Sequence, residues 1–379
     1  MKKTIYILIA AIMAACTETK LGLTSYNTEE APVSTSPDEH LLDSTEMDVE
    51  YVTSLDLPNG VPDIVCEKFT YEYGHFFVMD NSVNKTVFVF DSLGNFVTRL
   101  GERGRAQNEY VQSPTDFFVK RNQDVCVFER ASQRILKFTA KGIFINADRF
   151  ESFPYSACAI NDGNYLCAFN HKMAKDGMQL ALMSPDEDII ESYIELKENQ
   201  KYVTSERTFF KNDDIVYHVP NLSDSILVFQ GDSVDRVVKL NFDCGYVPQH
   251  IVHEIYDEDM NEYKNYKGVR AIMEYYETQK FRFVTYRKSM FVLKNLIDKE
   301  TCQQICFSSV PFDGLFPPCT LYVKNDKMYL FVTKEDVKML KDSMSSDKLQ
   351  ECLHGARKVV RDMFDGVYGF PIVLSAKLK

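Results

Sequence analysis

Short apolar segments separated by polar turns recur along most of the chain. Two clear copies each contain three such segments, at residues 76–80, 87–91 and 96–100, and then at 125–129, 135–138 and 143–145. The segments are rich in β-branched and aromatic residues, and Gly and Asx residues lie between them, as at 91–95. This pattern favours strands joined by hairpin turns over helices.

Four weaker copies begin at residues 165, 215, 281 and 328, which gives six copies in total. With two helical segments set aside, each copy takes up about 44 residues, which is the length of a four-stranded propeller blade. The pattern therefore predicts an all-β fold, a six-bladed β-propeller over residues 47–379. Because the copies are unevenly spaced, a large β-sandwich or two stacked β-domains remain alternatives.

A propeller has to close its ring, because an open end leaves a strand edge unpaired. Segments 47–52 and 371–378 lie at the two ends of the predicted ring and are both suited to strands. We expect residues 371–378 to form a strand that completes a shared or adjacent blade with the first segment. Removing this strand should then prevent folding.

Two segments break the strand pattern and carry apolar residues at helical spacing. The first, about residues 248–280, mixes an apolar stripe with acidic and tyrosine residues, and is a candidate helical lid over one propeller face. The second, about residues 334–364, is amphipathic and precedes the last predicted strand. For this second segment, a helix packed on the propeller rim is favoured over a free partner-binding helix.

The beginning of the chain has the features of a signal peptide. Lys2 and Lys3 precede an apolar run, residues 4–15, that is too short to span a bilayer. The run ends in Met13-Ala14-Ala15-Cys16, which resembles the bacterial lipobox. The resemblance implies removal of residues 1–15 and attachment of diacylglycerol and palmitate-type chains to Cys16. An ordinary secretory signal followed by a chance cysteine is the alternative.

Residues 16–46 are rich in Thr, Ser, Glu and Pro, so we expect a flexible tether. A multi-chain lipid holds a protein to a membrane without a transmembrane helix. The start of the chain therefore predicts a lipoprotein of the cell envelope whose folded part lies outside the cytoplasm. An outer-membrane location is favoured, with its periplasmic or cell-surface face left open.

The stretch 88–117 resembles the six-bladed β-propeller lipoproteins of Bacteroides and relatives. That family usually carries a Gly-Arg-Gly-Pro-Gly-Glu-Tyr loop between its first blades. Gly104, Arg105, Glu109 and Tyr110 match this loop, whereas residues 106–108 depart from it. The resemblance implies a closed ring related in fold to NHL-repeat and TolB-like propellers. It implies no particular activity, because the family is largely of unknown function.

Composition narrows the partners. The net charge of −12 would repel nucleic acid, so no nucleic-acid partner is expected. Of the ten cysteines, nine remain after lipidation of Cys16, so at least one is left without a partner within the chain. Four of them, Cys66, Cys126, Cys158 and Cys167, lie in apolar alternation, where cysteine is usually a small core residue. Cys302 and Cys306 are the local candidates for a single disulfide.

The loop 101–110 is the best candidate for a ligand site. Arg103 and Arg105 offer planar donors to a carboxylate or a sugar hydroxyl, and Tyr110 offers a stacking surface. The alternative is that Arg105 and Glu109 form an internal ion pair that fixes the connection between two blades.

His250, His253 and Asp257 would share one side of a helix, which makes them weak candidates for a metal site. A solvated acidic helix is the favoured interpretation. The sequence has no Gly-x-Ser-x-Gly elbow and no Gly-rich phosphate loop, and no cofactor is expected.

These features favour a non-enzymatic binding or scaffold lipoprotein for a glycan, peptide or protein partner. The alternative is a propeller enzyme, a lyase or hydrolase with a metal or acid–base residues in the central funnel. Its motivation is that His75, His171 and His218 lie in or beside predicted strands. Catalysis therefore stays an open question at this point.

Overall fold

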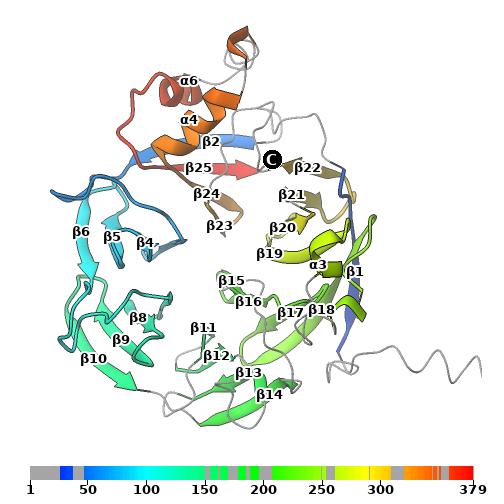
Figure 1. Ribbon diagram of the computed structural model, residues 1–379, viewed down its shortest axis with the longest axis horizontal. Helices are drawn as coiled ribbons and strands as arrows, with labels where there is room; N and C mark the ends of the chain where they lie inside the picture. The colour runs from blue at the N-terminus through cyan, green and yellow to red at the C-terminus, as the bar shows by residue number, and fades with distance from the viewer. Residues whose placement is uncertain are drawn as a thin grey trace, which may run out of the picture.

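The computed structural model shows six β-sheets arranged as blades around a central axis (Figure 1). The predicted six-bladed β-propeller is therefore confirmed, and the sandwich alternative is excluded. The structure describes residues 26–36, 47–149, 154–160, 163–169, 178–184, 188–195, 207–248, 250–252, 261–289, 291–308, 320–343, 345–347, 350 and 358–378.

Blades 1, 2, 3 and 5 each contain four antiparallel strands that follow one another along the chain, with the first strand innermost. Blade 1 comprises β3 (Lys68–Glu72), β4 (His75–Asp80), β5 (Thr86–Asp91) and β6 (Phe96–Leu100). Blade 2 comprises β7 (Asp116–Val119), β8 (Asp124–Glu129), β9 (Arg134–Thr139) and β10 (Phe144–Arg149). Blade 3 comprises β11 (Ser156–Ala159), β12 (Tyr165–Ala168), β13 (Met178–Met183) and β14 (Ile189–Glu195). Blade 5 comprises β19 (Val269–Glu277), β20 (Phe281–Lys288), β21 (Phe291–Asp298) and β22 (Gln304–Ser308).

Blade 6 closes the ring with strands from both ends of the propeller. It comprises β23 (Thr320–Lys324), β24 (Lys327–Val332), β25 (Ile372–Leu378) and β2 (Met47–Ser54). Strand β25 pairs with β24 on one side and with β2 on the other, antiparallel in both cases. The last strand of the chain is thus enclosed by two neighbours, as the terminal segments predict.

Blade 4 has a fifth strand that the sequence pattern did not predict. It comprises β15 (Phe209–Asn212), β16 (Ile215–His218), β17 (Ser225–Gln230), β18 (Ser233–Phe242) and, parallel to β18 on its outer side, β1 (Thr28–Val33). The prediction of a flexible tether over residues 16–46 is therefore wrong for β1. The strand buries Ala31 and Val33 in the core, and this burial offsets the entropy cost of ordering a polar segment.

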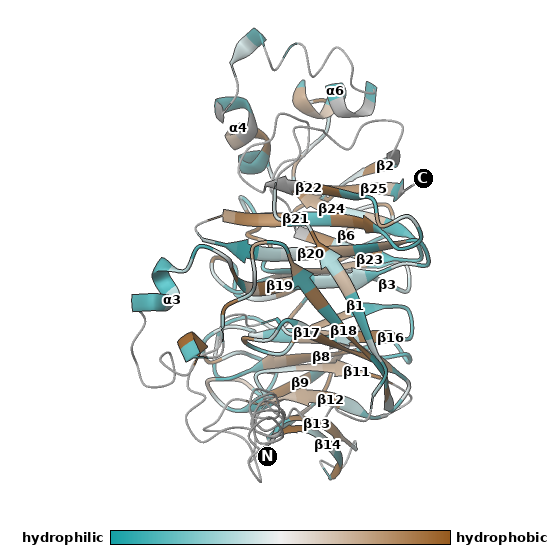
Figure 2. Cartoon of the chain, turned by 90° about the vertical axis from the view of Figure 1, so that its right-hand side faces the viewer, coloured by the Kyte–Doolittle hydropathy of each residue, from teal (hydrophilic) through white to brown (hydrophobic). Residues whose placement is uncertain are grey.

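The core fills the seams between neighbouring blades, because alternate side chains of each strand point to opposite faces of its sheet. One cluster of buried residues joins blades 1 and 2, another joins blades 2 and 3, and a third joins blades 3 and 4. The largest cluster runs through blades 4, 5, 6 and 1. Figure 2 shows apolar residues along the blade strands and hydrophilic residues on the projecting helix α3 (Asn261–Asn265).

The first predicted helical insertion, about 248–280, is wrong for β19. Residues 269–277 are buried on both faces of a sheet, so their continuous apolar run fits a strand as well as a helix. Pairing with β20 decides for the strand. Helix α3 and residues 250–252 are the helical parts of this segment among the described residues, and residues 253–260 lie outside them.

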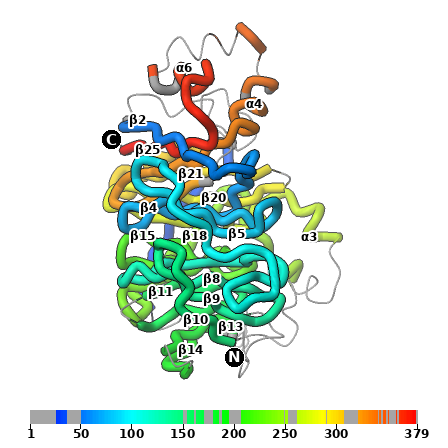
Figure 3. Tube along the Cα trace, turned by 90° about the vertical axis from the view of Figure 1, so that its left-hand side faces the viewer, coloured from blue at the N-terminus to red at the C-terminus, as the bar shows by residue number. Residues whose placement is uncertain are grey.

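The second segment does contain helices, α4 (Lys334–Ser343) and α6 (Lys358–Phe364). Both connect β24 to β25, and Figure 3 shows them beside β2 and β25 at the edge of the ring. Val337 and Met363 are buried in the main core cluster, which agrees with helices packed on the rim. Among the described residues, no helix is long and apolar enough to cross a membrane.

Candidate functional site

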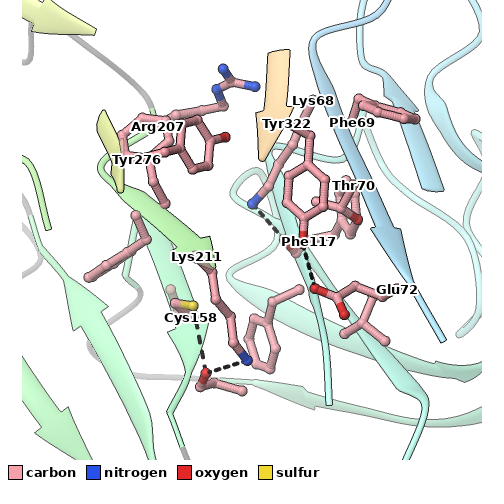
Figure 4. A pocket seen from close by; sticks show the side chains of 16 residues that line it. Lys68, Phe69, Thr70, Glu72, Phe117, Cys158, Arg207, Lys211, Tyr276 and Tyr322 are labelled. Carbon is pink, nitrogen blue, oxygen red and sulfur yellow. Dashed lines mark hydrogen bonds between the residues drawn. The ribbon is translucent and has the colours of Figure 1, made fainter. Parts of the chain in front are cut away.

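The innermost strands surround one cavity on the propeller axis (Figure 4). Side chains of all six blades line it, and its volume is about 60 Å³. A buried water needs about 10–15 Å³ of such space. The cavity therefore has room for a few waters or one small chemical group.

The cavity has two chemically different ends. The innermost strands all run in the same direction along the axis, because every blade begins at the axis with the same strand order. Lys68, Asp116 and Arg207 lie where these strands start, and we call this the start end. Glu72, Lys211 and Lys324 lie where the strands finish, and we call this the finish end.

At the start end, a charged pair joins three blades. Lys68 Nζ lies 2.5 Å from Asp116 Oδ1 and donates to the Phe117 carbonyl at 2.7 Å. Asp116 is only 1% exposed, and its second oxygen accepts a hydrogen bond from Ser156 Oγ at 2.7 Å. Because both charges are paired and hydrogen-bonded, this cluster is satisfied within the protein.

Arg207 crosses the axis at the same end. From blade 4 it donates to Glu274 Oε1 of blade 5 at 2.6 Å, and to the Glu67 carbonyl beside blade 1 at 3.2 Å. Thr285 Oγ1 donates to the other carboxylate oxygen of Glu274 at 2.8 Å. Burial disfavours the charge of Arg207, but the Glu274 carboxylate together with Tyr276 and other neighbouring groups outweighs this cost, and the pKa of Arg207 is raised. Arg207 thus binds opposite sides of the ring together.

At the finish end, Glu72 is held by two donors from blade 6. Tyr322 OH donates to Glu72 Oε1 at 2.6 Å, and Lys324 Nζ bonds the other oxygen. Burial and the adjacent Glu72 carboxylate raise the pKa of Tyr322 well above its ordinary value. Tyr322 is therefore a neutral donor, and the charge of Glu72 is matched by Lys324.

Lys211 differs from the other cations of the cavity. Among the described residues, its ammonium group makes one polar contact, a long hydrogen bond of 3.5 Å to the Ala159 carbonyl. Asp214, three residues further along the chain, forms an ion pair with Arg121 at 2.8 Å instead. Burial raises the pKa of the neighbouring Cys158 thiol, and Lys211 offsets only part of this effect. Among the residues that the structure describes, Lys211 is therefore a cation of the cavity without a matching carboxylate.

The walls between the two ends are mostly apolar. Phe117, Tyr276 and Tyr322 contribute aromatic rings, and the hydroxyl of Tyr276 donates to the Leu321 carbonyl at 3.4 Å. The hydroxyl of Thr70 is buried, and no described residue is its hydrogen-bond partner. Lys211 and Thr70 are thus two groups of the lining that have hydrogen-bonding capacity to spare.

The predicted loop site has a different structure from the one we expected. Tyr110 is fully buried and bonds the Leu100 carbonyl through its hydroxyl, so its proposed role as a stacking surface is wrong. Glu109 Oε2 accepts a hydrogen bond from the Ala106 amide at 2.8 Å and fixes the loop from inside. Arg103 and Arg105 are exposed. Ligand binding by these two arginines stays a prediction.

The predicted histidine sites are not brought together. His250 is exposed and lies 3.9 Å from Glu262, whereas His253 and Asp257 fall outside the described residues. His75 belongs to blade 1 and His218 to blade 4, and His171 is also outside the described part. Over the described ranges, no group of three His, Cys, Asp or Glu side chains is placed to hold a metal ion.

Cys302 is an exposed free thiol, so the predicted disulfide with Cys306 is wrong. Cys306 is buried and shares a hydrogen bond with Tyr286 OH at 3.4 Å. Cys126, Cys158 and Cys167 are buried core residues, as their apolar surroundings in the sequence predict. Cys16 lies outside the described residues.

Sequence reasoning missed the cavity residues. Lys68, Arg207 and Lys211 are charged residues at the ends of short apolar strands, where a lysine or arginine is unremarkable. One signal was available, because an innermost strand of a propeller has to face the axis. Charged residues beside the first strand of several repeats were therefore candidates for the channel.

A family model described as "Domain of unknown function (DUF4934)" matches residues 65–357 of the chain. No curated protein matches the chain.

Several solved structures are similar to this chain, and one of them has a TM-score above 0.5. The structure of a candidate exported protein from Bacteroides fragilis is 18% identical, with a TM-score of 0.71, over 93% of this chain and all of that one. A DUF4221 family member from Bacteroides vulgatus is 10% identical, with a TM-score of 0.48, over 88% of this chain and 98% of that one. Virginiamycin B lyase from Staphylococcus aureus is 12% identical, with a TM-score of 0.40, over 75% of this chain and 82% of that one. At these identities the likeness concerns the fold alone.

Proposed function

The chain belongs to the DUF4934 family, and we propose that this member is a lipid-anchored binding protein of the cell envelope whose ligand occupies the axial cavity. The ligand is a glycan, a peptide or an exposed part of a protein partner that presents a small group to the cavity. Export and anchoring depend on the signal-like start of the chain and on Cys16.

The observation that carries the binding role is the cavity itself. It collects side chains from all six blades, and Lys211 and Thr70 retain donors that the protein does not use. Ligand sites are typically concave and mostly apolar, with a small number of placed polar groups. The cavity has this composition.

The start of β1 supports anchoring close to a membrane. Asn27 accepts a hydrogen bond from the Val237 amide, so the chain is attached to blade 4 from this point. Nine residues separate Cys16 from Tyr26, and the ten steps between the two Cα atoms reach at most about 35 Å when fully extended. A lipid on Cys16 would therefore hold the propeller near the bilayer surface.

Metabolic labelling with an alkyne analogue of palmitate tests the anchor. The wild-type protein should be labelled and recovered with membranes, whereas Cys16→Ala should be unlabelled. Cys302→Ala is the matched control, because Cys302 is an exposed thiol on the folded part. Labelling of Cys16→Ala, or no labelling of the wild type, would contradict the anchor.

Saturation-transfer NMR against a panel of envelope glycans and peptides tests the cavity. Thr70→Met should weaken binding, because the longer side chain fills part of the cavity. Thr28→Met is the control, because Thr28 is exposed on β1. Equal binding by both variants, or conversion of a bound compound to product, would contradict a binding role for this cavity.

A further inference from the structure

We propose that Lys211 binds a carboxylate group inside the axial cavity, an inference that rests on the proposed binding function. The first argument is charge pairing. Lys68, Arg207 and Lys324 each contact a carboxylate, on Asp116, Glu274 and Glu72 respectively. Lys211 contacts only a carbonyl oxygen among the described residues.

This lack of a carboxylate partner is notable in a chain with a net charge of −12. Acidic residues are abundant, yet two of them at the finish end bind other cations, Glu72 with Lys324 and Asp214 with Arg121. A half-buried ammonium group without a counter-ion costs free energy, and a bound anion recovers it. The cavity is therefore better suited to an anion than to a neutral or cationic group.

Size and charge select a carboxylate over a phosphate. The cavity of about 60 Å³ admits one small group, and one cation neutralises one negative charge. A phosphate monoester carries close to two negative charges at pH 7 and would leave one of them unmatched. The buried hydroxyl of Thr70 provides a second, neutral donor in the same lining.

A third lysine at the finish end, Lys120, does not compete with Lys211 for a bound carboxylate. Lys120 Nζ lies over the ring of Tyr165, 5.1 Å from its centroid, and so faces blade 3. Burial opposes the charge of Lys120, but Cys126, Tyr165 and Asp124 raise its pKa overall. Lys211 lines the same cavity as the aromatic side chains of Phe117, Tyr276 and Tyr322. These rings suit an apolar stem attached to the carboxylate.

The carboxylate has two possible sources, a free organic acid or the carboxyl terminus of a peptide. Titration calorimetry with isovalerate, with a short apolar peptide and with the amide of the same peptide separates them. If only isovalerate binds, the ligand is a free acid. If the peptide binds but its amide does not, the ligand is the carboxyl terminus of a peptide. Inorganic phosphate is the comparison anion, and it should bind at least about tenfold more weakly than the carboxylate that binds.

The decisive variants are Lys211→Met and Lys211→Arg, with Lys141→Met as the control on an exposed turn of blade 2. We expect Lys211→Met to raise the Kd for the carboxylate at least tenfold, and Lys211→Arg to stay within about threefold of wild type. Lys141→Met should leave the Kd unchanged. The melting temperature of each variant shows whether it is folded. If Lys211→Met does not fold, Lys211→Arg still allows the test.

An unchanged Kd in Lys211→Met would overturn the inference, as would phosphate binding as tightly as the carboxylates. If ligands bind in a Thr70-dependent manner but without any dependence on Lys211, the inference fails and the proposed function survives. If no compound depends on either residue, both fail.

Discussion

The buried carboxylates at the start end of the channel are paired with cations of other blades, and Arg207 connects three blades. It bridges blades 4, 5 and 1 through Glu274 and the Glu67 carbonyl. Breaking a buried pair leaves the remaining charge without compensation, which is costly even where the intact pair contributes little. These side chains therefore matter more for the integrity of the ring than for ligand chemistry.

Arg207→Met should lower the free energy of unfolding by about 3 kcal/mol, because Glu274 would be left buried and only partly solvated. The double variant Arg207→Met with Glu274→Leu should recover part of this loss, since no charge is stranded. Urea titration of both proteins measures the difference. A single variant as stable as the wild type would show that the bridge is not formed.

His218 gives a dependence on pH that can be assigned to one side chain. Burial lowers the pKa of His218 from 6.5 to about 3 in the folded protein. Because the unfolded chain binds the proton more readily, the contribution of neutral His218 to stability is complete above pH 6.5. It is lost at about 1.4 kcal/mol per pH unit as the pH falls below that value.

His218→Phe removes the titrating group and keeps an aromatic ring beside Phe209. The unfolding free energy of this variant should therefore fall less steeply between pH 6.5 and 4 than that of the wild type. Denaturant titrations at several pH values provide the comparison. Parallel curves for the two proteins would contradict burial of a neutral His218.

Strand β1 ties the start of the chain to two blades. It pairs with β18 of blade 4, and Glu29 forms ion pairs with Arg236 of blade 4 and Arg282 of blade 5. Ser34 adds backbone contacts to blade 5, because its carbonyl accepts hydrogen bonds from Tyr286 and Asn295, both at 2.8 Å. Tension on a membrane anchor would thus reach the seam between blades 4 and 5.

Val33→Ala tests whether β1 is part of the fold. Val33 is 1% exposed in the main core cluster, so losing two methyl groups should cost about 2 kcal/mol of unfolding free energy. Glu30→Ala is the control on the same strand, because Glu30 is exposed. Equal stability of the two variants would mean that β1 is not docked.

Features that depend on residues close together in the sequence could be predicted, whereas features that depend on distant residues could not. Hairpins such as β4–β5–β6 were predictable because alternation and turn chemistry lie within about 25 residues. Strand β1 was missed because its partner β18 lies some 200 positions away and nothing local favours a strand. The cavity was missed for the same reason, since Lys211 and its neighbours meet only when the ring closes. Segment 269–277 was misassigned as helix because a continuous apolar run fits the periodicity of a helix as well as that of a strand.

The whole molecule depends on closure by its terminal strands. Strand β25 lies between β24 and β2, so it is hydrogen-bonded along both of its edges inside blade 6. Without it, two strand edges and the core faces of blades 1 and 5 would be exposed to water. The closed ring in turn creates the axial cavity, because the six innermost strands converge only in the complete circle.

Truncation after Phe370 should abolish the cooperative unfolding transition and yield an aggregating product. Deleting residues 17–25, an equal length of the predicted tether, should leave the transition in place. Differential scanning calorimetry of the two proteins distinguishes them. A cooperative transition in the truncated chain would contradict closure by β25.

The most direct test of the cavity as a ligand site is an anomalous-scattering map from crystals soaked in sodium bromide. Bromide is a small anion that can enter a cavity of about 60 Å³. If the cavity is a ligand site, a bromide peak should lie on the axis in contact with Lys211 Nζ in the wild type, and crystals of Lys211→Met should have no such peak. Bromide only at surface lysines, with the axis empty in both, would contradict it.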